Sequence, residues 1–403
     1  MDVFCVGLVF SRSDLRYQSY ARQYVEALLR LQKNVAIFSP DWILLNQYFQ
    51  INFRDQSKRI HCFALSASTD LDSHSSKFSF LMKHLAFRRV FKNAERRMGL
   101  KIDFLFFAPV DDWIRPAFPK YWLNRILTCP WSGLLLNMTG YGQINNLAEP
   151  SKLPLNVDPV FKEPDYLLSV EKCMAVCTLD RFRSEQLKSR VYKKVIVMPD
   201  ISDYDLPKET PNWIAQIKRM AHGRMIVGTV LLEGDKPEEF IRLMNDAAME
   251  HYFFICVGII DSKKLSKEGI ERLNNLLSLG KNNFYFILDA IEEYEQMNAI
   301  INAFDVCFIS PGEMNLPHGI ISKAAYFKKP LLGLLGEMSG WLIASFKLGI
   351  CLKMGSEEGL QALHTFRLQM PLSQNFDSSS AQNYAQLQNQ TYLREAWEML
   401  LWV

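Results

Sequence analysis

The sequence lacks the short motifs that mark several common enzyme classes. It contains no HExxH, GxSxG or GxxxxGK(S/T) pattern, so the sequence gives no indication of a zinc protease, a serine hydrolase or a P-loop NTPase. It also has no run of about eighteen apolar residues, so no membrane-spanning helix is predicted. The formal net charge is +3 over 403 residues, which is too small to indicate nucleic-acid binding.

Cysteine pairs at metal-ligand spacing are missing as well. The eight cysteines are scattered, and several stand in apolar runs where a free thiol acts as a small hydrophobic group. Cys173 and Cys177 are close in sequence, but no second Cys or His pair follows at zinc-finger spacing, so no metal is expected. Reduced thiols of this kind indicate the cytoplasm. The first residues also lack the basic start and the cleavage site of a signal peptide.

Apolar runs alternate with helix-length segments along the whole chain. A chain of 403 residues that is 49% hydrophobic predicts two folded domains. Continuous apolar strands separated by helices are typical of parallel sheets covered on both faces. The predicted strands of the amino-terminal half are 3–10, 35–39, 60–64, 104–108, 133–137, 174–178 and 195–198. Those of the carboxyl-terminal half are 225–231, 253–258, 284–287, 306–309, 331–334 and 349–352.

This rhythm predicts an α/β protein made of two Rossmann-like, doubly wound domains. We expect residues 1–201 to form the first domain and residues 212–377 the second. Residues 202–211 are rich in Asp and Pro and are expected to be a linker. Residues 378–403 begin polar and end in an amphipathic helix, which we expect to pack back on the amino-terminal domain.

One segment of the carboxyl-terminal half has the form of an anion site. A buried strand at 306–309 leads into a loop rich in Pro and Gly, and a helix follows at 320–327. Free N–H groups and about half a positive charge from the helix dipole make such a helix start favourable for phosphate. In doubly wound sheets this crevice is where nucleotides bind. The predicted ligands are Asn315, His318, Gly319, Ile320, Ile321, Ser322 and Lys323.

These residues and their order resemble the donor half of GT-B glycosyltransferases. The runs Val227-Gly228-Thr229-Val230, Ala303-Phe304-Asp305-Val306 and Lys328-Lys329-Pro330-Leu331 follow the order seen in the retaining, metal-independent members. The resemblance implies two Rossmann-like domains that face each other across a cleft, with the acceptor bound by 1–201 and the donor by 212–377. It also implies transfer of a sugar from a nucleotide diphosphate sugar to a hydroxyl of a glycan, lipid-linked or protein-linked acceptor, without a metal or other cofactor.

The chain departs from that family's pattern at the donor site. Lys323 stands where the large retaining group has the second Glu of its Glu–x7–Glu pair, and Thr229 stands where an Arg grips the diphosphate. Lys236 is an approximate match for the family's Lys, and His318-Gly319 is similar to the helix opening of divergent bacterial transferases. These departures keep open a catalytically inactive, GT-B-like partner or scaffold subunit of an active transferase. A sugar-nucleotide epimerase shares the fold.

Charged residues follow two strands of the amino-terminal half. Asp111 and Asp112 come after the strand at 104–108, and either could orient or deprotonate an acceptor hydroxyl; a helix N-cap is the alternative role. The loop at 11–19 after the first strand contains no glycine. The residues of this loop predicted to lie near the acceptor or the phosphate are Arg12, Arg16, Tyr17 and Gln18, and a solvated loop is the alternative.

Residues 80–101 combine an apolar stripe with seven Lys and Arg side chains. Such a helix can lie on an anionic membrane surface, or its stripe can pack in the core with a solvated basic face. The resemblance adds weight to the membrane hypothesis, because many transferases of this type act on lipid-linked acceptors. The predicted location is the cytoplasm, with peripheral contact at the inner face of the membrane through 80–101 as one hypothesis.

Overall fold

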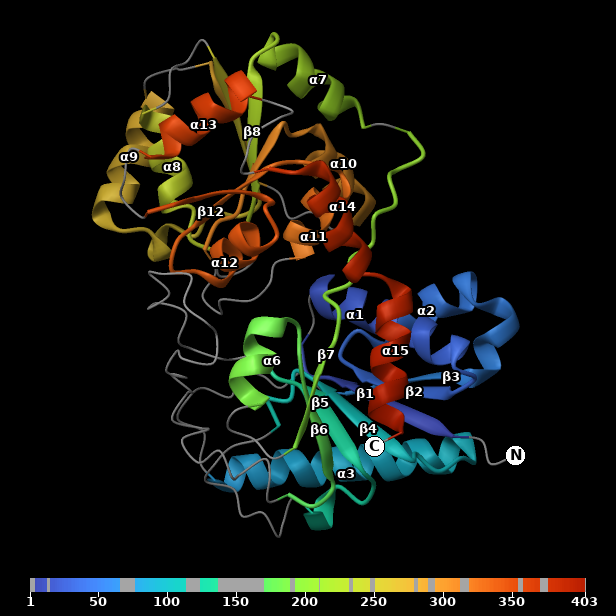
Figure 1. The fold of residues 1–403 in the computed structure, drawn as a ribbon. Helices are drawn as coiled ribbons and strands as arrows, with labels where there is room; N and C mark the ends of the chain where they lie inside the picture. Colours follow the sequence, from blue (N-terminus) through green and yellow to red (C-terminus); the bar gives the residue numbers. More distant parts are fainter. Residues whose placement is uncertain are drawn as a thin grey trace. The chain divides into compact units, whose positions relative to one another are not determined.

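The protein divides into two compact units (Figure 1). The computed structural model describes residues 4–12, 15–65, 77–113, 124–136, 170–188, 193–209, 211–231, 235–246, 251–278, 282–288, 294–311, 319–353, 358–369 and 376–402. Of these, the residues up to Ile201 and those from Asn389 onward form the first unit, and those from Ser202 to Gln388 form the second.

The first unit is built on a seven-stranded parallel sheet in the order β3-β2-β1-β4-β5-β6-β7. Its strands are β1 (Cys5–Phe10), β2 (Asn34–Ser39), β3 (Ile60–Ala64), β4 (Phe104–Ala108), β5 (Trp131–Leu134), β6 (Cys173–Thr178) and β7 (Lys194–Val197). Its helices include α1 (Leu15–Arg30), α2 (Trp42–Asn52), α3 (Lys77–Met98), α6 (Arg181–Lys188) and α15 (Gln390–Leu401), with a 3-10 turn η1 (Arg54–Arg59) after α2.

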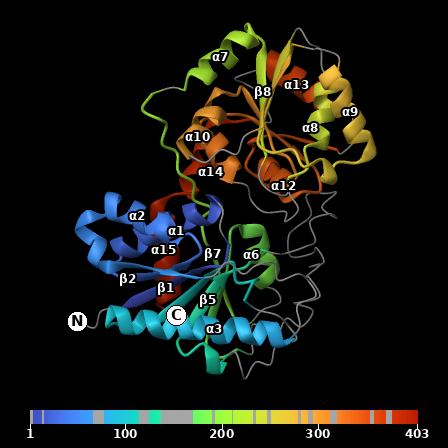
Figure 2. The same ribbon diagram turned by 180° about the vertical axis from the view of Figure 1, so that it is seen from behind.

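Neighbouring residues on β4 show how this sheet is covered on both faces. Phe106 lies against Tyr24 of α1 and Trp397 of α15, with ring centroids 5.7 and 4.8 Å away. Phe107 points to the other face, where its ring is 5.9 Å from Phe87 of α3. Side chains of a strand alternate between faces, so α1 and α15 cover one face and α3 the other. In Figure 1, α15 at the chain's end lies beside elements from its beginning, and Figure 2 shows α3 running along the sheet.

The apolar stripe of α3 is part of the core. Phe87, Phe91 and Ala94 are at most 4% exposed and belong to one cluster with residues of the central strands. Met98 is partly buried against the same cluster, whereas Arg97 is exposed. The hypothesis of a membrane helix at 80–101 is therefore wrong for the apolar side, because the sheet already covers it. Phe80 lies outside the described side chains.

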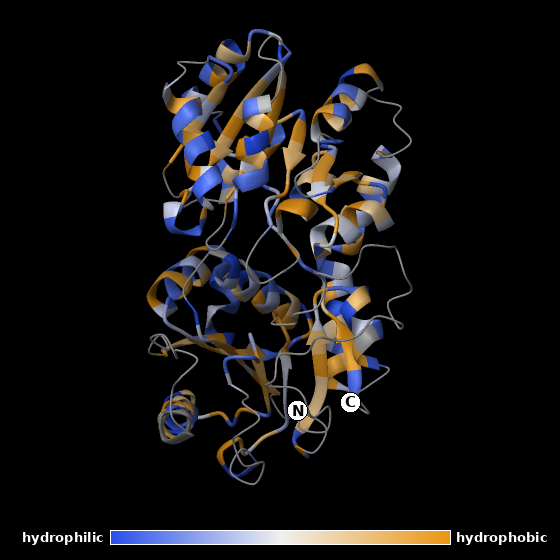
Figure 3. Cartoon of the chain, turned by 90° about the vertical axis from the view of Figure 1, so that its left-hand side faces the viewer, coloured by the Kyte–Doolittle hydropathy of each residue, from blue (hydrophilic) through white to orange (hydrophobic). Residues whose placement is uncertain are grey.

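The second unit repeats the scheme with a six-stranded parallel sheet in the order β10-β9-β8-β11-β12-β13. Its strands are β8 (Met225–Val230), β9 (Tyr252–Val257), β10 (Phe284–Ile287), β11 (Val306–Phe308), β12 (Leu331–Leu334) and β13 (Gly349–Leu352). Its helices include α7 (Asn212–Ala221), α8 (Glu238–Asp246), α9 (Lys267–Ser278), α10 (Tyr294–Ala303), α11 (Gly319–Tyr326), α12 (Met338–Ser345), α13 (Glu358–Gln369) and α14 (Ser378–Leu387). In Figure 3 the strands of both units are coloured mainly as hydrophobic, as expected for sheets buried on both faces.

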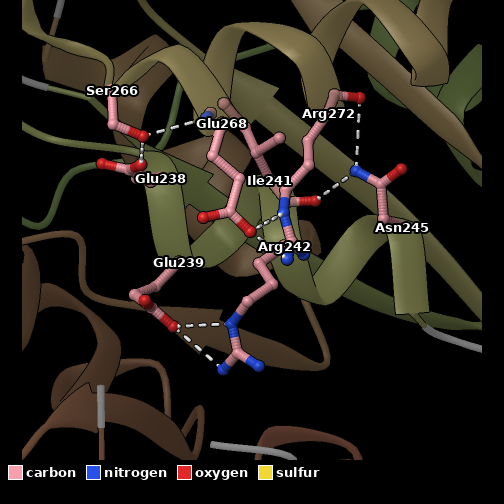
Figure 4. Close-up of polar contacts among 9 residues, drawn as sticks. Glu238, Glu239, Ile241, Arg242, Asn245, Ser266, Glu268 and Arg272 are labelled. Carbon is pink, nitrogen blue, oxygen red and sulfur yellow. Dashed lines mark hydrogen bonds and ion pairs between the residues drawn. The ribbon is translucent and has the colours of Figure 1, made fainter. Parts of the chain in front are cut away.

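Polar contacts join the two outer helices α8 and α9 of this unit (Figure 4). The Ser266 hydroxyl donates a hydrogen bond to Glu238, and the Asn245 side chain donates to the Arg272 carbonyl oxygen at 3.3 Å. Within each helix, Arg242 pairs with Glu239 at 2.9 Å and Arg272 with Glu268 at 2.7 Å. The contacts of Ser266 with Glu238 and of Asn245 with Arg272 therefore hold α8 and α9 side by side.

The doubly wound α/β fold predicted from the sequence is confirmed. The carboxyl-terminal segment differs in one respect from its prediction. Only α15, with Asn389 as its N-cap, belongs to the first unit, whereas α14 belongs to the second unit and contacts α11. Among the described helices, none has the length and apolar character needed to cross a membrane. All eight cysteines are free thiols.

Candidate functional site

Each sheet reverses its strand order at one point, and this point defines a candidate site in each unit. In the first sheet β1 lies between β2 and β4, and in the second sheet β8 lies between β9 and β11. The crossover connections leave in opposite directions on the two sides of such a point, which opens a crevice at the carboxyl ends of the two central strands. Ligands of doubly wound folds bind in this crevice.

In the second unit, small hydroxyl side chains line the reversal point. The Thr229 hydroxyl on β8 and the Ser310 hydroxyl after β11 are 3.1 Å apart, and both residues are buried. Beyond β8, the backbone N–H of Lys236 donates to the Pro311 carbonyl oxygen at 2.8 Å, while the Lys236 side chain is exposed. Small groups at the base and one cation at the rim make this crevice suitable for an anionic ligand.

Helix α11 begins next to this crevice. It follows the carboxyl end of β11, and its first turn contains Gly319, Ile320 and Ile321. The predicted ligands Asn315 and His318 lie outside the described residues. Ser322 is fully buried, so it helps anchor the helix in the unit. The structure thus brings the start of α11 to the same sheet edge as Thr229.

Lys323 is placed differently from its predicted role as a phosphate ligand. It is 3% exposed, and its ammonium group donates hydrogen bonds to the Asp203 carbonyl oxygen and to Asn298 Oδ1, the latter at 2.5 Å. The Asn298 amide in turn donates to the Asp205 carbonyl oxygen at 2.8 Å. These hydrogen bonds direct Lys323 toward residues 203–205 and α10.

The start of the linker runs along α11. The Ser202 hydroxyl donates to the Gly319 carbonyl oxygen at 3.2 Å, and the Tyr204 ring stacks on Tyr326 with centroids 4.2 Å apart. With the Asp203–Lys323 hydrogen bond, the consecutive residues Ser202, Asp203 and Tyr204 contact positions 319, 323 and 326 of α11. This spacing is that of a single helix face, so residues 202–204 bind α11 along its length.

In the first unit, an ion pair closes the reversal point. Arg12, which follows β1, makes two hydrogen bonds to the carboxylate of Asp112, at 3.0 and 2.9 Å, and the Ser11 hydroxyl donates to the same group at 2.6 Å. Burial alone would raise the pKa of Asp112, but the hydrogen bonds from Arg12 and Ser11 outweigh it, so the pKa lies below its ordinary value. A carboxylate of low pKa is a weak base, and this arrangement favours an orienting role.

Asp111 and Arg183 hold the end of β5. Asp111 accepts a hydrogen bond from the Leu136 N–H at 2.8 Å, and Arg183 donates to the Leu136 carbonyl oxygen at 2.9 Å. Arg183 is fully buried and lies 3.6 Å from the carboxylate of Asp180. Burial raises the pKa of Asp180, and Arg183 partly counteracts this. Arg183 could not be identified from the sequence, because an Asp and an Arg at a helix start usually face solvent.

The other predicted residues of the first loop lie on α1. Tyr17 is 3% exposed and has its ring edge-on to Tyr20, 6.3 Å away. The Gln18 amide donates to Asp41 at 3.1 Å, across to the loop after β2. Arg16 is half-buried on the same helix. The structure therefore brings Arg12 and Asp112 into contact, while Tyr17 and Gln18 make contacts that pack α1 against its neighbours.

Several solved structures that are similar to this chain are glycosyltransferases. One from Rickettsia africae matches with a TM-score of 0.63 at 12% identity, over 99% of this chain and 98% of that one. HepE from Anabaena, in complex with UDP, matches with a TM-score of 0.59 at 13% identity over 100% of both chains. Trehalose-phosphate synthase from Escherichia coli, with bound UDP-2-fluoro glucose, gives 0.60 at 13% identity over 98% of both. The chain has the GT-B fold.

The GT-B fold is shared without recognisable sequence similarity. No known family profile and no curated protein sequence matches the chain. At identities of 11–13%, the roles of individual residues in those structures do not carry over to the crevice of this chain. A common fold supports many chemistries, so the function has to be argued from these residues.

One further ionisable residue, which the sequence did not indicate, lies at the carboxyl edge of the second sheet. Glu337 follows β12 and is the N-cap position of α12. Burial raises the pKa of Glu337, and Lys236 partly counteracts the effect. The electrostatic influence of Lys236 places both side chains in one neighbourhood, although they are far apart in sequence. A position at the carboxyl end of β12 was the signal that could have identified Glu337.

We expect Glu337→Gln to stabilise the protein at neutral pH. A carboxyl group whose pKa is raised on folding contributes stability below its ordinary pKa, and this contribution is lost as the pH rises through the folded pKa. Glutamine does not ionise, so the variant should have the higher melting temperature at pH 7.5, and the difference should shrink toward pH 4. Thermal unfolding at both pH values measures this. A difference that grows on acidification would contradict the raised pKa.

Proposed function

We propose that the protein transfers a sugar from a nucleotide diphosphate sugar to a hydroxyl acceptor. The observation that carries the proposal is that α11 starts at the carboxyl edge of the second sheet, the same edge at which Thr229 and Ser310 lie at the reversal point. The free N–H groups of a helix start and its dipole suit a diphosphate. The structures of HepE and of trehalose-phosphate synthase contain UDP and a UDP-sugar, which supports a nucleotide-sugar donor.

In this proposal the charge of the leaving diphosphate is stabilised without a metal. The bond between the anomeric carbon and the diphosphate oxygen breaks, the bond from that carbon to the acceptor oxygen forms, and the acceptor proton passes to a base. The first-turn amides of α11 and the exposed ammonium of Lys236 would take the negative charge of the leaving group. Asp112, held by Arg12, would shape the acceptor-side loop.

The roles of Asp111 and Asp112 follow from their partners. Asp111 fixes the Leu136 amide, and Asp112 fixes Arg12 and Ser11. We assign to them the orientation of the strand ends at which an acceptor hydroxyl would be held, with Arg12 and Lys83 as cations at this edge. We place the enzyme in the cytoplasm, since its eight cysteines are free thiols.

Lys236→Met is expected to weaken donor binding about tenfold or more, because a charge-assisted contact to phosphate is worth about 1.5–3 kcal/mol. Isothermal titration with UDP-, GDP-, ADP- and dTDP-sugars first identifies the donor and then compares the variant with wild type. Lys267→Met, at an exposed position on α9, is the matched control and should bind as wild type does. Absence of binding to every donor at millimolar concentration would rule out the proposed function.

A catalytically inactive partner of an active transferase is the second candidate. It is favoured by Lys323, which occupies the place of the family's Glu and is bonded to Asp203 and Asn298. Mass spectrometry of a reaction with donor and candidate acceptors separates the two functions. Release of nucleotide together with a glycoside supports the enzyme. Donor binding without turnover, in a preparation that contains a copurifying transferase, supports the partner.

A further inference from the structure

A pocket lies at the amino edge of the second sheet, opposite the edge that carries the candidate donor site. Its volume is about 390 Å³, a size typical of small-molecule sites. Strand β8 begins at this pocket and has six residues, so its carboxyl end lies roughly 20 Å away. In Figure 1, α7 and α13 lie at this end of the second unit, and α12 lies at the other. The lining includes His222, Gly223, Arg224, His251, Asp305 and Arg367.

Two charged groups of this pocket have structural partners. The Arg224 guanidinium donates hydrogen bonds to two of the last carbonyl oxygens of α7, at 2.6 and 2.9 Å, and so offsets the negative end of that helix. Asp305 accepts a hydrogen bond from the Ile226 N–H at 2.8 Å. Burial lowers the pKa of Lys329, and the negative charge of Asp305 opposes this effect. Lys329 therefore offsets the charge of Asp305 from outside the pocket lining.

Three other side chains bring donors to the pocket from three separate segments. The side chains of His222, His251 and Arg367 make no hydrogen bond or ion pair with other described residues. Arg367, on α13, reaches the start of β9, because its charge opposes the effect of burial, which raises the pKa of Tyr252. Gly223, with φ of 78°, leaves open space where a side chain would begin. The pocket thus keeps one guanidinium and two imidazoles available to a ligand.

We propose that this pocket binds a phosphate group, at a site separate from the donor crevice. The Arg367 guanidinium pairs with two phosphate oxygens, because its planar fork matches their spacing. His222 and His251 donate to the remaining oxygens. Donors from three segments can reach the oxygens of a tetrahedral phosphate, whereas a planar carboxylate offers only two. The phosphate is either a free ion or part of a small phosphorylated molecule whose organic part fills the rest of the volume.

Isothermal titration of the full chain with inorganic phosphate, ribose 5-phosphate and acetate tests the proposal. At least one of the two phosphates should bind, and acetate should bind much more weakly. Arg367→Gln should weaken phosphate binding about tenfold or more, because a charge-assisted bidentate pair is lost. His222→Gln/His251→Gln should weaken it about fivefold, as expected for two neutral hydrogen bonds. Tighter binding of ribose 5-phosphate assigns the site to a phosphorylated molecule, and tighter binding of inorganic phosphate assigns it to the free ion.

Two further variants control for charge and for the donor crevice. Arg54→Gln, at an exposed position of the first unit, is the matched control and should bind phosphate as wild type does. Equal melting temperatures of wild type and Arg367→Gln establish that folding is unchanged. The proposal is overturned if neither phosphate binds, or if acetate binds as tightly. Binding that Lys236→Met abolishes and Arg367→Gln leaves unchanged would place the phosphate in the donor crevice and also overturn it.

Discussion

Lys323→Glu is expected to destabilise the second unit by about 3–5 kcal/mol, the cost of leaving a buried charge without a partner. The ammonium group lies between the carbonyl oxygen of Asp203 and the amide oxygen of Asn298. Both partners only accept hydrogen bonds at these atoms, so a carboxylate in the same place would meet oxygen against oxygen. Urea unfolding followed by tryptophan fluorescence measures the loss.

Two further variants separate the buried network from a role in phosphate binding. Lys323→Met keeps the apolar stem and should cost less, about 1–3 kcal/mol, because two acceptors lose their donor. Lys267→Glu, at an exposed position of α9, should stay within about 0.5 kcal/mol of wild type. If Lys323→Glu unfolds like wild type but loses donor affinity, the ammonium group serves the diphosphate and the contact to the linker is incidental.

Arg183→Met is expected to have a comparable effect in the first unit. The guanidinium is fully buried, donates to the Leu136 carbonyl oxygen at 2.9 Å and lies 3.6 Å from Asp180. Its removal leaves a buried carboxylate without its cation, which costs about 3–5 kcal/mol near neutral pH. Denaturant unfolding at pH 8 measures this cost.

The pH dependence identifies the cause of that loss. Burial already raises the pKa of Asp180, and loss of Arg183 raises it further. A carboxyl group whose pKa is raised on folding stabilises the fold below its ordinary pKa, about 3.9. This contribution is lost as the pH rises through the pKa of the folded state. The difference between wild type and Arg183→Met should therefore be smaller at pH 4.5 than at pH 8. Adding Asp180→Asn should recover part of the loss at pH 8; a constant difference would point to lost packing alone.

The strands could be predicted from the sequence because both sheets are buried on two faces. The predicted bounds 60–64, 104–108, 284–287 and 331–334 coincide with β3, β4, β10 and β12. Each of these strands is a short run of mainly apolar side chains, fully buried in β4 and β12 and partly buried in the edge strands β3 and β10, and no helix periodicity competes with it. Helix α2 escaped prediction for the opposite reason. Its apolar residues do not form one stripe, because Leu45 and Phe49 are buried while Ile43, Leu44 and Ile51 are exposed, so no pattern of period 3.6 marks it.

The position of the candidate site was also predictable, but its contacts were not. A polar loop after β11 and charged residues after β1 and β4 indicate where ligands bind once the strand order is known. The partners of those residues lie far away in sequence: Arg12 is 100 residues from Asp112, and Lys323 is 120 residues from Asp203. Residue type shows that Lys323 can donate, whereas only the fold decides which acceptor it reaches.

The contacts between residues 202–204 and α11 have a consequence for dissecting the protein. A fragment of the second unit that begins at Asn212, where α7 starts, would omit Ser202, Asp203 and Tyr204. The buried ammonium of Lys323 would then lose one acceptor, and Tyr326 its stacked ring. An excised second unit should instead run from Ser202 to Gln388, because the Gln388 carbonyl oxygen accepts a hydrogen bond from Tyr204. Both cut sites then fall at the residues where the chain leaves this unit.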